Sequence, residues 1–382
     1  MSVQVSYKKQ ILVYVIISII LLVFTEIFIR YLDSFEPKCE FIKSEIFSNF
    51  NESIKNQLCS EYNSLELEYT LPIGINKPNQ YGTFVNINSD GLRGDEIQEN
   101  NTYRIIFLGG STTFGIVSTS DETTIPALVE KKLFEKKIVT EVINAGINGA
   151  SSIDEFYFLE NKLLKFNPDM VVMYDGWNDV NSYNFLKNNI EFEEYKNNSF
   201  YENNQYVNLS FTNNLGKILL QFLIDIDYKT GIGLIIFFRD FANISNYNQN
   251  EYLIENNMSD LNLIEKNLKN NWSKVCNLGN NYSFITINFI QPGIDTGIRT
   301  HSNEEKIFLS QTNEINKINN LKELNIKNLQ SKNCKFVFDL RNTFDQINDK
   351  TIFFDSIHVS DYGNEIISEK IKDILIPIIQ NN

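Results

Sequence analysis

The amino-acid sequence predicts an α/β fold whose core is a doubly wound parallel sheet. From about residue 103 onward, apolar stretches of strand length alternate with segments of helical spacing. This alternation is typical of parallel sheets whose strands are joined by helices. Small polar residues and glycines follow the first three apolar stretches, at the strand ends where open α/β sheets bind their ligands.

An apolar segment near the N-terminus predicts a membrane helix. Residues 11–29 are interrupted only by Ser18, Thr25 and Glu26, and the run is close to the ~20 residues that a spanning helix needs. A cleaved signal peptide is the alternative, but its apolar region is usually shorter and ends in small residues. We therefore expect residues 1–10 to be a short tail and residues 11–30 to be an uncleaved anchor in the cytoplasmic membrane. The large C-terminal part would lie on the outer, periplasmic or extracellular side.

Residues 31–100 are expected to form a stalk and an N-terminal accessory segment. The stretch from Asp33 to Leu71 is polar and mixed, which suits a stalk or a small helical layer. Residues 81–88 alternate like a strand, and Ser89-Asp90-Gly91 provides a turn after them.

Residues 101–382 are expected to form the α/β domain. Its first strand is the buried run Arg104-Ile105-Ile106-Phe107-Leu108. The remaining elements alternate in order: helix 124–137, strand 139–145, helix 152–166, strand 169–174, helix 261–278, strand 283–290, largely helical 304–330, strand 335–340 and a last helix from about 361 to 376.

An insertion at about 183–257 separates the third strand from the helix before the fourth. It is rich in asparagine and tyrosine and holds two apolar runs, 218–226 and 232–241. Two extra helices packed on the core are one interpretation, and a lid or a membrane-resting patch is the other.

The composition excludes several classes of function. The chain carries a formal net charge of −14, whereas binding to nucleic acid needs clustered basic residues. It has two histidines, His301 and His358, and four cysteines without a C-x-x-C pair. We therefore expect no nucleic-acid partner, no metal site and no cofactor.

Three strand ends and one later loop carry the chemical groups that serine acylation requires. Ser111 follows the first strand, Gly149 the second and Asn178 the third, while Asp355 precedes His358 by three residues in a later loop. We expect Ser111 to be the nucleophile, His358 its base and Asp355 the group that orients the base. The N–H groups of Ser111 and Gly149 and the Asn178 amide would form the oxyanion hole.

Each of these motifs also has a structural interpretation. A Gly-Ser pair can be a plain turn, and Asp-x-x-His can begin a helix. The order of the motifs and their positions after predicted strands make the set specific. The second histidine, His301, lies in a polar run that offers no comparable acid, and we expect it in a surface loop.

The set resembles the SGNH/GDSL hydrolase superfamily over about residues 103–376. Gly109 to Thr113 matches its first block, Asn144 to Gly149 its second, Gly176 to Asp179 its third, and Asp355 to His358 its fifth. The resemblance implies a flavodoxin-like five-stranded sheet of order 2-1-3-4-5. The sequence departs from the named Gly-Asp-Ser-Leu pattern at Gly110 and Thr112, and the resulting Gly-Gly-Ser-Thr is a common variant in membrane-anchored members.

The resemblance implies a membrane-anchored serine esterase that hydrolyses short-chain acyl esters, often acetyl, on envelope or extracellular glycans. An O-acyltransferase, in which a sugar hydroxyl replaces water, is the first alternative, and a lysophospholipase or thioesterase is the second. An anchored glycan-binding protein without activity is a third, although a binding module has no need of Ser111, Asp355 and His358 together.

The implied strand order also bears on the cysteines. It places Cys276, before the fourth strand, near Cys334, before the fifth, and so predicts a disulfide between them at the edge opposite the active site. Cys39 and Cys59 would then pair within the stalk. A buried free thiol at Cys276 is the alternative.

Overall fold

The computed structural model describes residues 6–33, 39–68, 74–98, 102–181 and 258–381. It divides the chain into two compact units, one that contains the N-terminal helix and one that begins at Cys39. The predicted insertion at about 183–257 lies outside the described residues.

Helix α1 (Tyr7–Asp33) is the described part of the first unit. Its stretch from Tyr7 to Thr25 is long and apolar enough to cross a membrane, and none of that stretch is buried in the protein. A signal sequence near the N-terminus can also be this long and apolar, so α1 suits either role.

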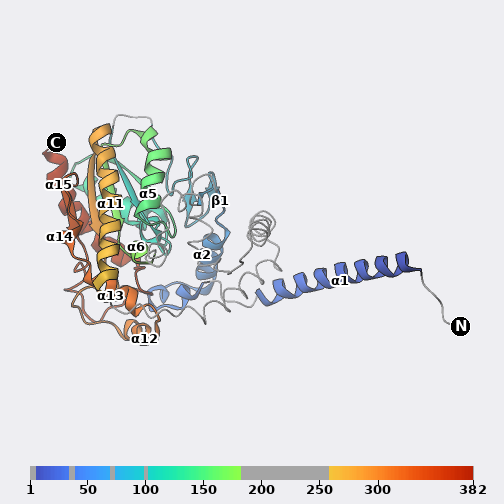
Figure 1. Cartoon of the computed structure of the whole chain (residues 1–382). Helices are drawn as coiled ribbons and strands as arrows, with labels where there is room; N and C mark the ends of the chain where they lie inside the picture. The colour runs from blue at the N-terminus through green and yellow to red at the C-terminus, as the bar shows by residue number, and fades with distance from the viewer. Residues whose placement is uncertain (1–5, 34–38, 69–73, 99–101, 182–257, 382) are drawn as a thin grey trace. The chain divides into compact units, whose positions relative to one another are not determined.

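A parallel five-stranded sheet is the centre of the second unit (Figure 1). Its order is β6-β5-β7-β8-β9, which is 2-1-3-4-5 in chain order and confirms the predicted fold class. The strands are β5 (Tyr103–Gly109), β6 (Thr140–Gly146), β7 (Met170–Asp175), β8 (Ile285–Ile290) and β9 (Phe336–Asp339).

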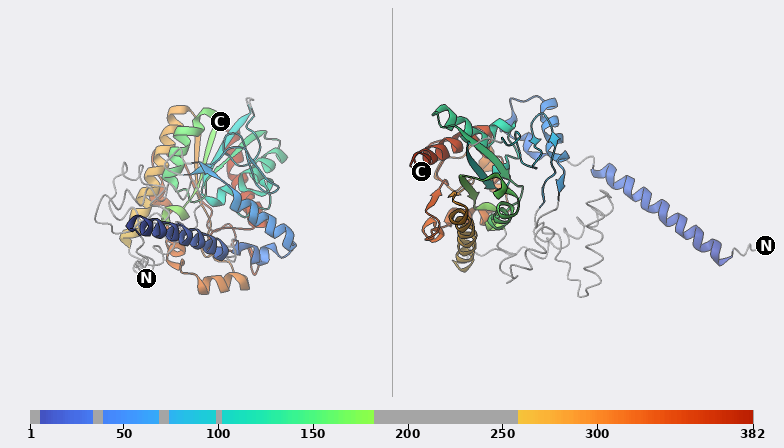
Figure 2. Two further views of the ribbon diagram at one scale, coloured as in Figure 1. Left: turned by 90° about the vertical axis from the view of Figure 1, so that its right-hand side faces the viewer. Right: turned by 90° about the horizontal axis from the view of Figure 1, so that it is seen from above.

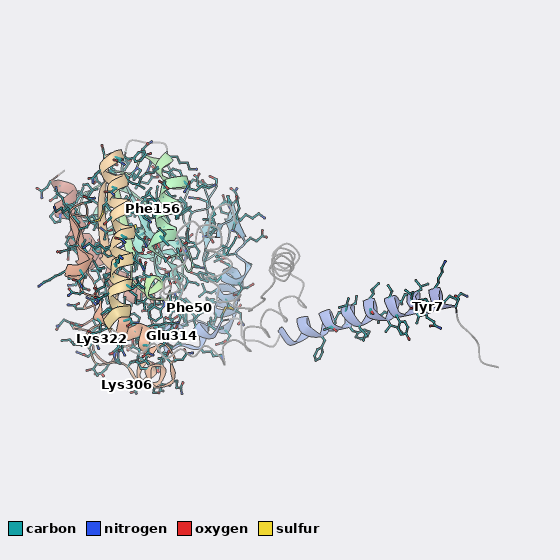
Figure 3. All side chains as sticks on the ribbon, viewed as in Figure 1. Tyr7, Phe50, Phe156, Lys306, Glu314 and Lys322 are labelled. Carbon is teal, nitrogen blue, oxygen red and sulfur yellow. A yellow bond between two sulfur atoms is a disulfide. The ribbon has the colours of Figure 1, made fainter. Side chains whose placement is uncertain are left out.

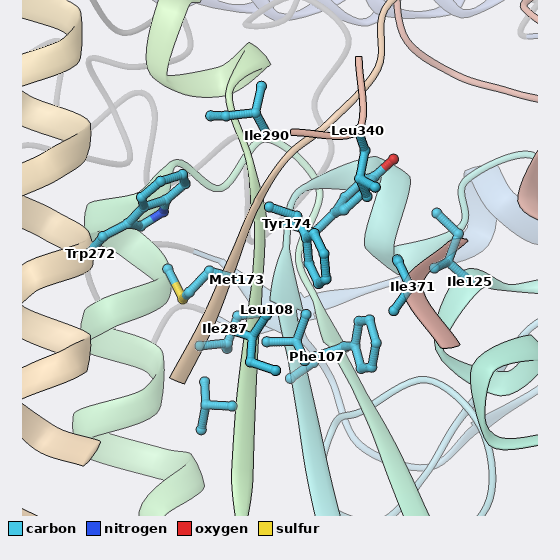
Figure 4. Close-up of a cluster of buried hydrophobic side chains, with 14 of the residues drawn as sticks. Phe107, Leu108, Ile125, Met173, Tyr174, Trp272, Ile287, Ile290, Leu340 and Ile371 are labelled. Atoms are coloured by element: carbon cyan, nitrogen blue, oxygen red, sulfur yellow. The ribbon is translucent and has the colours of Figure 1, made fainter. Parts of the chain in front are cut away.

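The central strands are buried on both faces because helices cover each side of the sheet. Helices α4 (Ile125–Glu135) and α15 (Asp361–Gln380) pack together on one face. Helices α5 (Ser152–Phe158) and α11 (Met258–Tyr282) pack together on the other. Figure 4 shows Trp272 of α11 on one side of the strands and Ile371 of α15 on the opposite side. This two-sided cover explains why the strands are continuous apolar runs.

Two predicted helical stretches are broken into shorter pieces. The predicted helix 152–166 is α5 followed by a π-helical turn at Leu159–Leu163 and a 3-10 turn at Leu164–Phe166. The predicted helical region 304–330 consists of α12 (Asn303–Gln311), α13 (Ile315–Glu323) and α14 (Ile326–Leu329).

The single strand predicted at residues 81–88 is wrong. The structure has a hairpin there, with β3 (Gln80–Tyr81) antiparallel to β4 (Asn86–Ile87). The chain turns where the Gly82 N–H donates to the Val85 carbonyl at 3.1 Å. The Glu61 carboxylate fixes the turn because it accepts the Phe84 N–H at 2.7 Å. The alternation in the sequence therefore came from two arms of a hairpin.

Residues 39–68 and 74–98, here called the N-terminal layer, pack against the sheet domain (Figure 2). Ile75 and Leu92 join the main core, and Phe47 and Leu58 form a smaller core with Val117. The layer contains η1 (Glu40–Lys43), η2 (Glu45–Phe47), α2 (Glu52–Ser64), β1 (Leu67–Glu68), β2 (Ile75–Asn76) and the β3–β4 hairpin.

Both predicted disulfides are present, and all four cysteines are paired. Cys276 of α11 is bonded to Cys334, with their Cα atoms 5.4 Å apart. Cys39 and Cys59 are bonded within the N-terminal layer, with their Cα atoms 5.8 Å apart. The free thiol considered for Cys276 is therefore not formed.

Candidate active site

Ser111 lies at the carboxyl edge of the sheet, where β5 ends. It is the first residue of the short helix α3 (Ser111–Phe114). In the register, Gly109 of β5 stands opposite Gly146 of β6 and Tyr174 of β7. The three strands therefore end level with one another, and the loops that follow them meet around Ser111.

The structure brings Ser111, His358 and Asp355 into one hydrogen-bonded chain. His358 Nε2 lies 2.7 Å from Ser111 Oγ, and His358 Nδ1 lies 2.6 Å from Asp355 Oδ2. A carboxylate accepts hydrogen bonds and does not donate them. Nδ1 therefore carries the proton, and Nε2 has a lone pair that can accept the Ser111 proton.

Asp355 is held as an anion by the loop that carries it. The backbone N–H groups of Ile357 and His358 donate to its Oδ1 at 2.9 and 2.7 Å. Burial alone would raise the pKa of Asp355, but the charge and hydrogen bonds of His358 lower it below its ordinary value. An ionised Asp355 can fix the ring and stabilise a positive charge on it.

Neighbouring elements hold this loop in place from two sides. The Ile294 N–H donates to the Ser356 carbonyl at 2.9 Å, and the Ser356 hydroxyl donates to Glu314, labelled in Figure 3. Glu305 of α12 accepts the N–H groups of Ile352 and Phe353, each at 3.0 Å. The sequence does not reveal these hydrogen bonds to Glu305 and Glu314, because only the folded chain brings α12 and the start of α13 to the loop.

Asn178 lies on α6 (Trp177–Asn181), directly after β7, and close to Gly110, the residue before Ser111. A Cβ atom on Gly110 would lie 2.2 Å from Asn178 Nδ2, so only glycine leaves room for the amide. The same nitrogen donates to the Ala150 carbonyl at 2.7 Å. This bond, which the sequence did not reveal, fixes the amide between the loops after β6 and β7.

Gly149 is exposed in the loop after β6. Its φ of +78° lies in the left-handed region that favours glycine, and no described atom lies within 4 Å of where a Cβ would stand. The structure thus places Ser111, Gly149 and Asn178 at the ends of three adjacent strands.

Buried carboxyl groups lie beneath these loops. Asp179 accepts a hydrogen bond from the Ser152 hydroxyl, and this bond joins the start of α5 to α6. Asp175 accepts the indole N–H of Trp272 at 2.6 Å. Burial raises the pKa of Asp175 to about 6. Burial also raises the pKa of Glu155 and that of Asp179 well above their ordinary values.

The expectation that His301 lacks an acidic partner is wrong. His301 Nε2 lies 3.0 Å from Asp295 Oδ1, and its Nδ1 lies 3.8 Å from Glu305 Oε2. The polar run is not a surface loop, since its turn into α12 leaves the His301 side chain 13% exposed. The hydrogen bond to Asp295 and the nearby Glu305 carboxylate raise the pKa of His301. His301 therefore belongs to an ion-pair cluster, while His358 is the histidine at Ser111.

Among the described residues, no group of three or more histidine, cysteine, aspartate or glutamate side chains has the arrangement of a metal site.

Comparisons with known proteins give structural matches only. No family model and no curated protein sequence matches the chain. The acetyl xylan esterase AlAXEase is 18% identical, with 71% of this chain and 98% of that chain covered and a TM-score of 0.39. LAE5, an alpha/beta hydrolase enzyme from the metagenome of Lake Arreo, is 12% identical, with 71% and 93% covered and a TM-score of 0.40. The lipase/acylhydrolase from Enterococcus faecalis is 15% identical, with 71% and 96% covered and a TM-score of 0.38.

The fold and the site together define a flavodoxin-like α/β domain with a hydrogen-bonded Ser–His–Asp chain at the carboxyl edge of its sheet.

Proposed function

We propose that this protein is a membrane-anchored serine hydrolase of the SGNH type that cleaves short-chain acyl esters. The observation that supports it most is the hydrogen-bonded chain from Ser111 through His358 to Asp355. The first and fifth blocks of the SGNH/GDSL resemblance contain these same residues. The proposed division of the chain is a tail at 1–10, an anchor at 11–30, an accessory segment at 31–100 and a hydrolase domain at 101–382.

In the proposed reaction, Ser111 Oγ attacks the ester carbonyl carbon while His358 Nε2 takes the hydroxyl proton. The tetrahedral intermediate places its negative charge among the N–H groups of Ser111 and Gly149 and the Asn178 amide. When the intermediate collapses, His358 returns the proton to the leaving alcohol and an acyl-enzyme remains. Water, activated by His358, then releases the acid. Asp355 stabilises the imidazolium that forms in both steps.

Asn178→Ala is expected to lower kcat by roughly 10²–10³, because an oxyanion donor acts on the transition state more than on the bound substrate. Steady-state kinetics with a p-nitrophenyl ester measure this. Asn161→Ala is the matched control, since Asn161 also donates to a backbone carbonyl, that of Tyr157 at 2.8 Å, but away from the strand ends. An effect confined to KM would instead make Asn178 a substrate-positioning group.

The proposed substrates are acetyl or other short acyl esters on envelope or extracellular glycans. Fluorophosphonate labelling of the full-length protein, followed by turnover of p-nitrophenyl esters of increasing chain length, tests the proposal. We expect labelling, and turnover that is fastest for acetate and falls with chain length. A preference for long chains would indicate a lipase or thioesterase, and a protein that neither labels nor turns over any ester would refute the hydrolase.

The proposed topology places the domain beyond Arg30 outside the cytoplasmic membrane. It predicts that the protein sediments with membranes, that carbonate does not extract it, and that protease added to spheroplasts digests the domain. A cytoplasmic marker protein should survive the same digestion. A soluble protein whose N-terminus begins after residue 30 would show that α1 is a cleaved signal sequence.

A further inference from the structure

An aromatic ring lies flat against the imidazole of His358. The rings of Phe354 and His358 are 5.5 Å apart between centroids and only 14° from parallel. Phe354 sits four residues before His358, and its N–H donates to the His358 carbonyl at 3.2 Å. The loop thus folds back so that one of its own side chains covers one face of the imidazole.

The N-terminal layer supports Phe354 through Phe41. The Phe41 ring lies 6.1 Å from that of Phe354 and 5.7 Å from that of Phe47. These distances are typical of favourable aromatic pairs. Phe47 is buried, and Phe41 and Phe354 pack against it in the same cluster. A continuous series of rings therefore joins the layer to His358.

The same layer also contacts the helix that begins with Ser111. Arg93 Nη1 donates to the carbonyls of Phe114 and Gly115 at 3.0 and 2.6 Å. Tyr62 Oη lies 2.6 Å from the Gly115 carbonyl. These carbonyls stand at the C-terminal end of α3, where a cation and a hydroxyl donor satisfy groups that the helix leaves open. The layer thus holds both the nucleophile helix and the ring beside the base.

A disulfide fixes the two parts of the layer that make these contacts. Cys39 is two residues before Phe41, and Cys59 is three residues before Tyr62. Asn63 Nδ2 lies 3.3 Å from Cys39 Sγ. The Phe41 and Tyr62 rings are 6.4 Å apart in an edge arrangement. The Phe41 contact to Phe354 and the Tyr62 contact to α3 therefore come from one cross-linked piece of chain, whereas Arg93 reaches α3 from a later part of the layer.

We infer that the N-terminal layer positions the base through Phe41 alone of its rings, with Phe354 as a positioning residue for His358 and Phe41 as its support. This inference rests on the proposed hydrolase function. The hydrogen bonds to Asp355 and Ser111 fix the two ring nitrogens of His358, but they do not prevent the ring from rotating about the line that joins those nitrogens. A flat neighbour on one face restricts that rotation, and a π-system next to an imidazolium is also electrostatically favourable. The segment that the sequence suggested as a stalk would then help to hold the His358 ring in position for proton transfer.

Phe354→Leu is expected to lower kcat by about 10- to 100-fold with little change in KM, because a base misplaced by a fraction of an ångström loses transition-state geometry and not binding. Phe354→Tyr keeps the flat ring and should recover most of the loss. Steady-state kinetics of the full-length protein in detergent, with melting temperatures alongside, measure both. Wild-type kcat in a folded Phe354→Leu protein, or no recovery with tyrosine, would overturn the inference.

Phe41→Leu should lower kcat in the same direction by a smaller factor. In the double variant with Phe354→Leu it should add almost nothing, since its support acts through Phe354. Phe50→Leu is the control: Phe50, labelled in Figure 3, belongs to the same layer and contacts the Phe47 ring at 6.1 Å. It should keep wild-type kcat. Full additivity of Phe41→Leu and Phe354→Leu would contradict the proposed support.

A readout that needs no activity separates this inference from the proposed function. The chain has two histidines, so ring signals of selectively labelled histidine can be assigned by comparison with His301→Ala. Removal of the Phe354 ring should change the chemical shifts of the His358 ring protons, as the ring-current field of Phe354 is lost, and leave the His301 signals in place. Unshifted His358 signals would overturn the stacking role. Absent ester turnover in the wild type would overturn the hydrolase instead. Phe41→Leu provides the same test should Phe354→Leu fail to fold.

Discussion

Ser111→Ala is expected to abolish ester hydrolysis and fluorophosphonate labelling while it leaves the fold intact. The hydroxyl of Ser111 lies 2.7 Å from His358 Nε2, and it is the atom that the proposed reaction acylates. Without it no acyl-enzyme can form, and any turnover that remains must come from bound water and the oxyanion donors. The measurement is labelling and p-nitrophenyl ester turnover of purified variant and wild type, with melting curves of both.

Ser368→Ala is the matched control for this substitution. Ser368 is also buried, and its hydroxyl donates to the Glu365 carbonyl at 2.8 Å within α15. It should keep full labelling and turnover, so that the loss in Ser111→Ala is due to the nucleophile and not to a missing buried hydroxyl. Labelling of Ser111→Ala at the wild-type rate would show that another residue is the nucleophile.

His358→Ala is expected to lower kcat by about 10⁴–10⁶, the range seen when the base of a Ser–His–Asp triad is removed. The substitution takes away the acceptor of the Ser111 proton and the donor to the leaving group at once. It also leaves Asp355 without the hydrogen bond at 2.6 Å that orients the base. Steady-state and single-turnover kinetics measure the effect, with KM expected to change far less than kcat.

His301→Ala provides the comparison, since it removes the other histidine. Its kcat should stay near that of the wild type, while its stability should fall. The hydrogen bond to Asp295 and the nearby Glu305 carboxylate raise the pKa of His301. The contribution of His301 to stability is therefore fully present below its ordinary pKa of 6.5 and is lost as the pH rises through the raised value. The variant should therefore lose more stability at pH 5 than at pH 8. The opposite ranking of the two histidine variants would refute the assignment of the base.

The sheet and the positions of the site residues could be predicted because both depend on local sequence. Buried parallel strands are continuous apolar runs, and the residue after such a run lies at the carboxyl edge whatever surrounds it. Ser111 and Asn178 were therefore placed correctly, and the three-residue spacing brought Asp355 to His358 within one loop.

Contacts between distant segments could not be predicted in this way. Phe41 and Phe354 are separated by most of the chain, and nothing in either neighbourhood indicates that their rings meet. His301 was misjudged although Asp295 and Glu305 are near in sequence, because its partners depend on how a loop without regular period turns into α12. The prediction of one strand at 81–88 is wrong for a related reason, since alternation does not distinguish one strand from the two short arms of a hairpin.

The buried carboxyl groups beneath the loops that follow β6 and β7 mean that folding takes up protons from the solution. Asp175, Glu155 and Asp179 each bind a proton more tightly in the folded chain than in the unfolded one, because burial disfavours their charged forms. Their contribution to the free energy of unfolding is fully present below the ordinary carboxyl pKa of about 4. For Asp175 it declines as the pH rises through its folded pKa of about 6. These groups therefore stabilise the region beneath the strand ends more at mildly acidic pH than at alkaline pH. This tolerance of acid comes from buried residues and not from the charged surface.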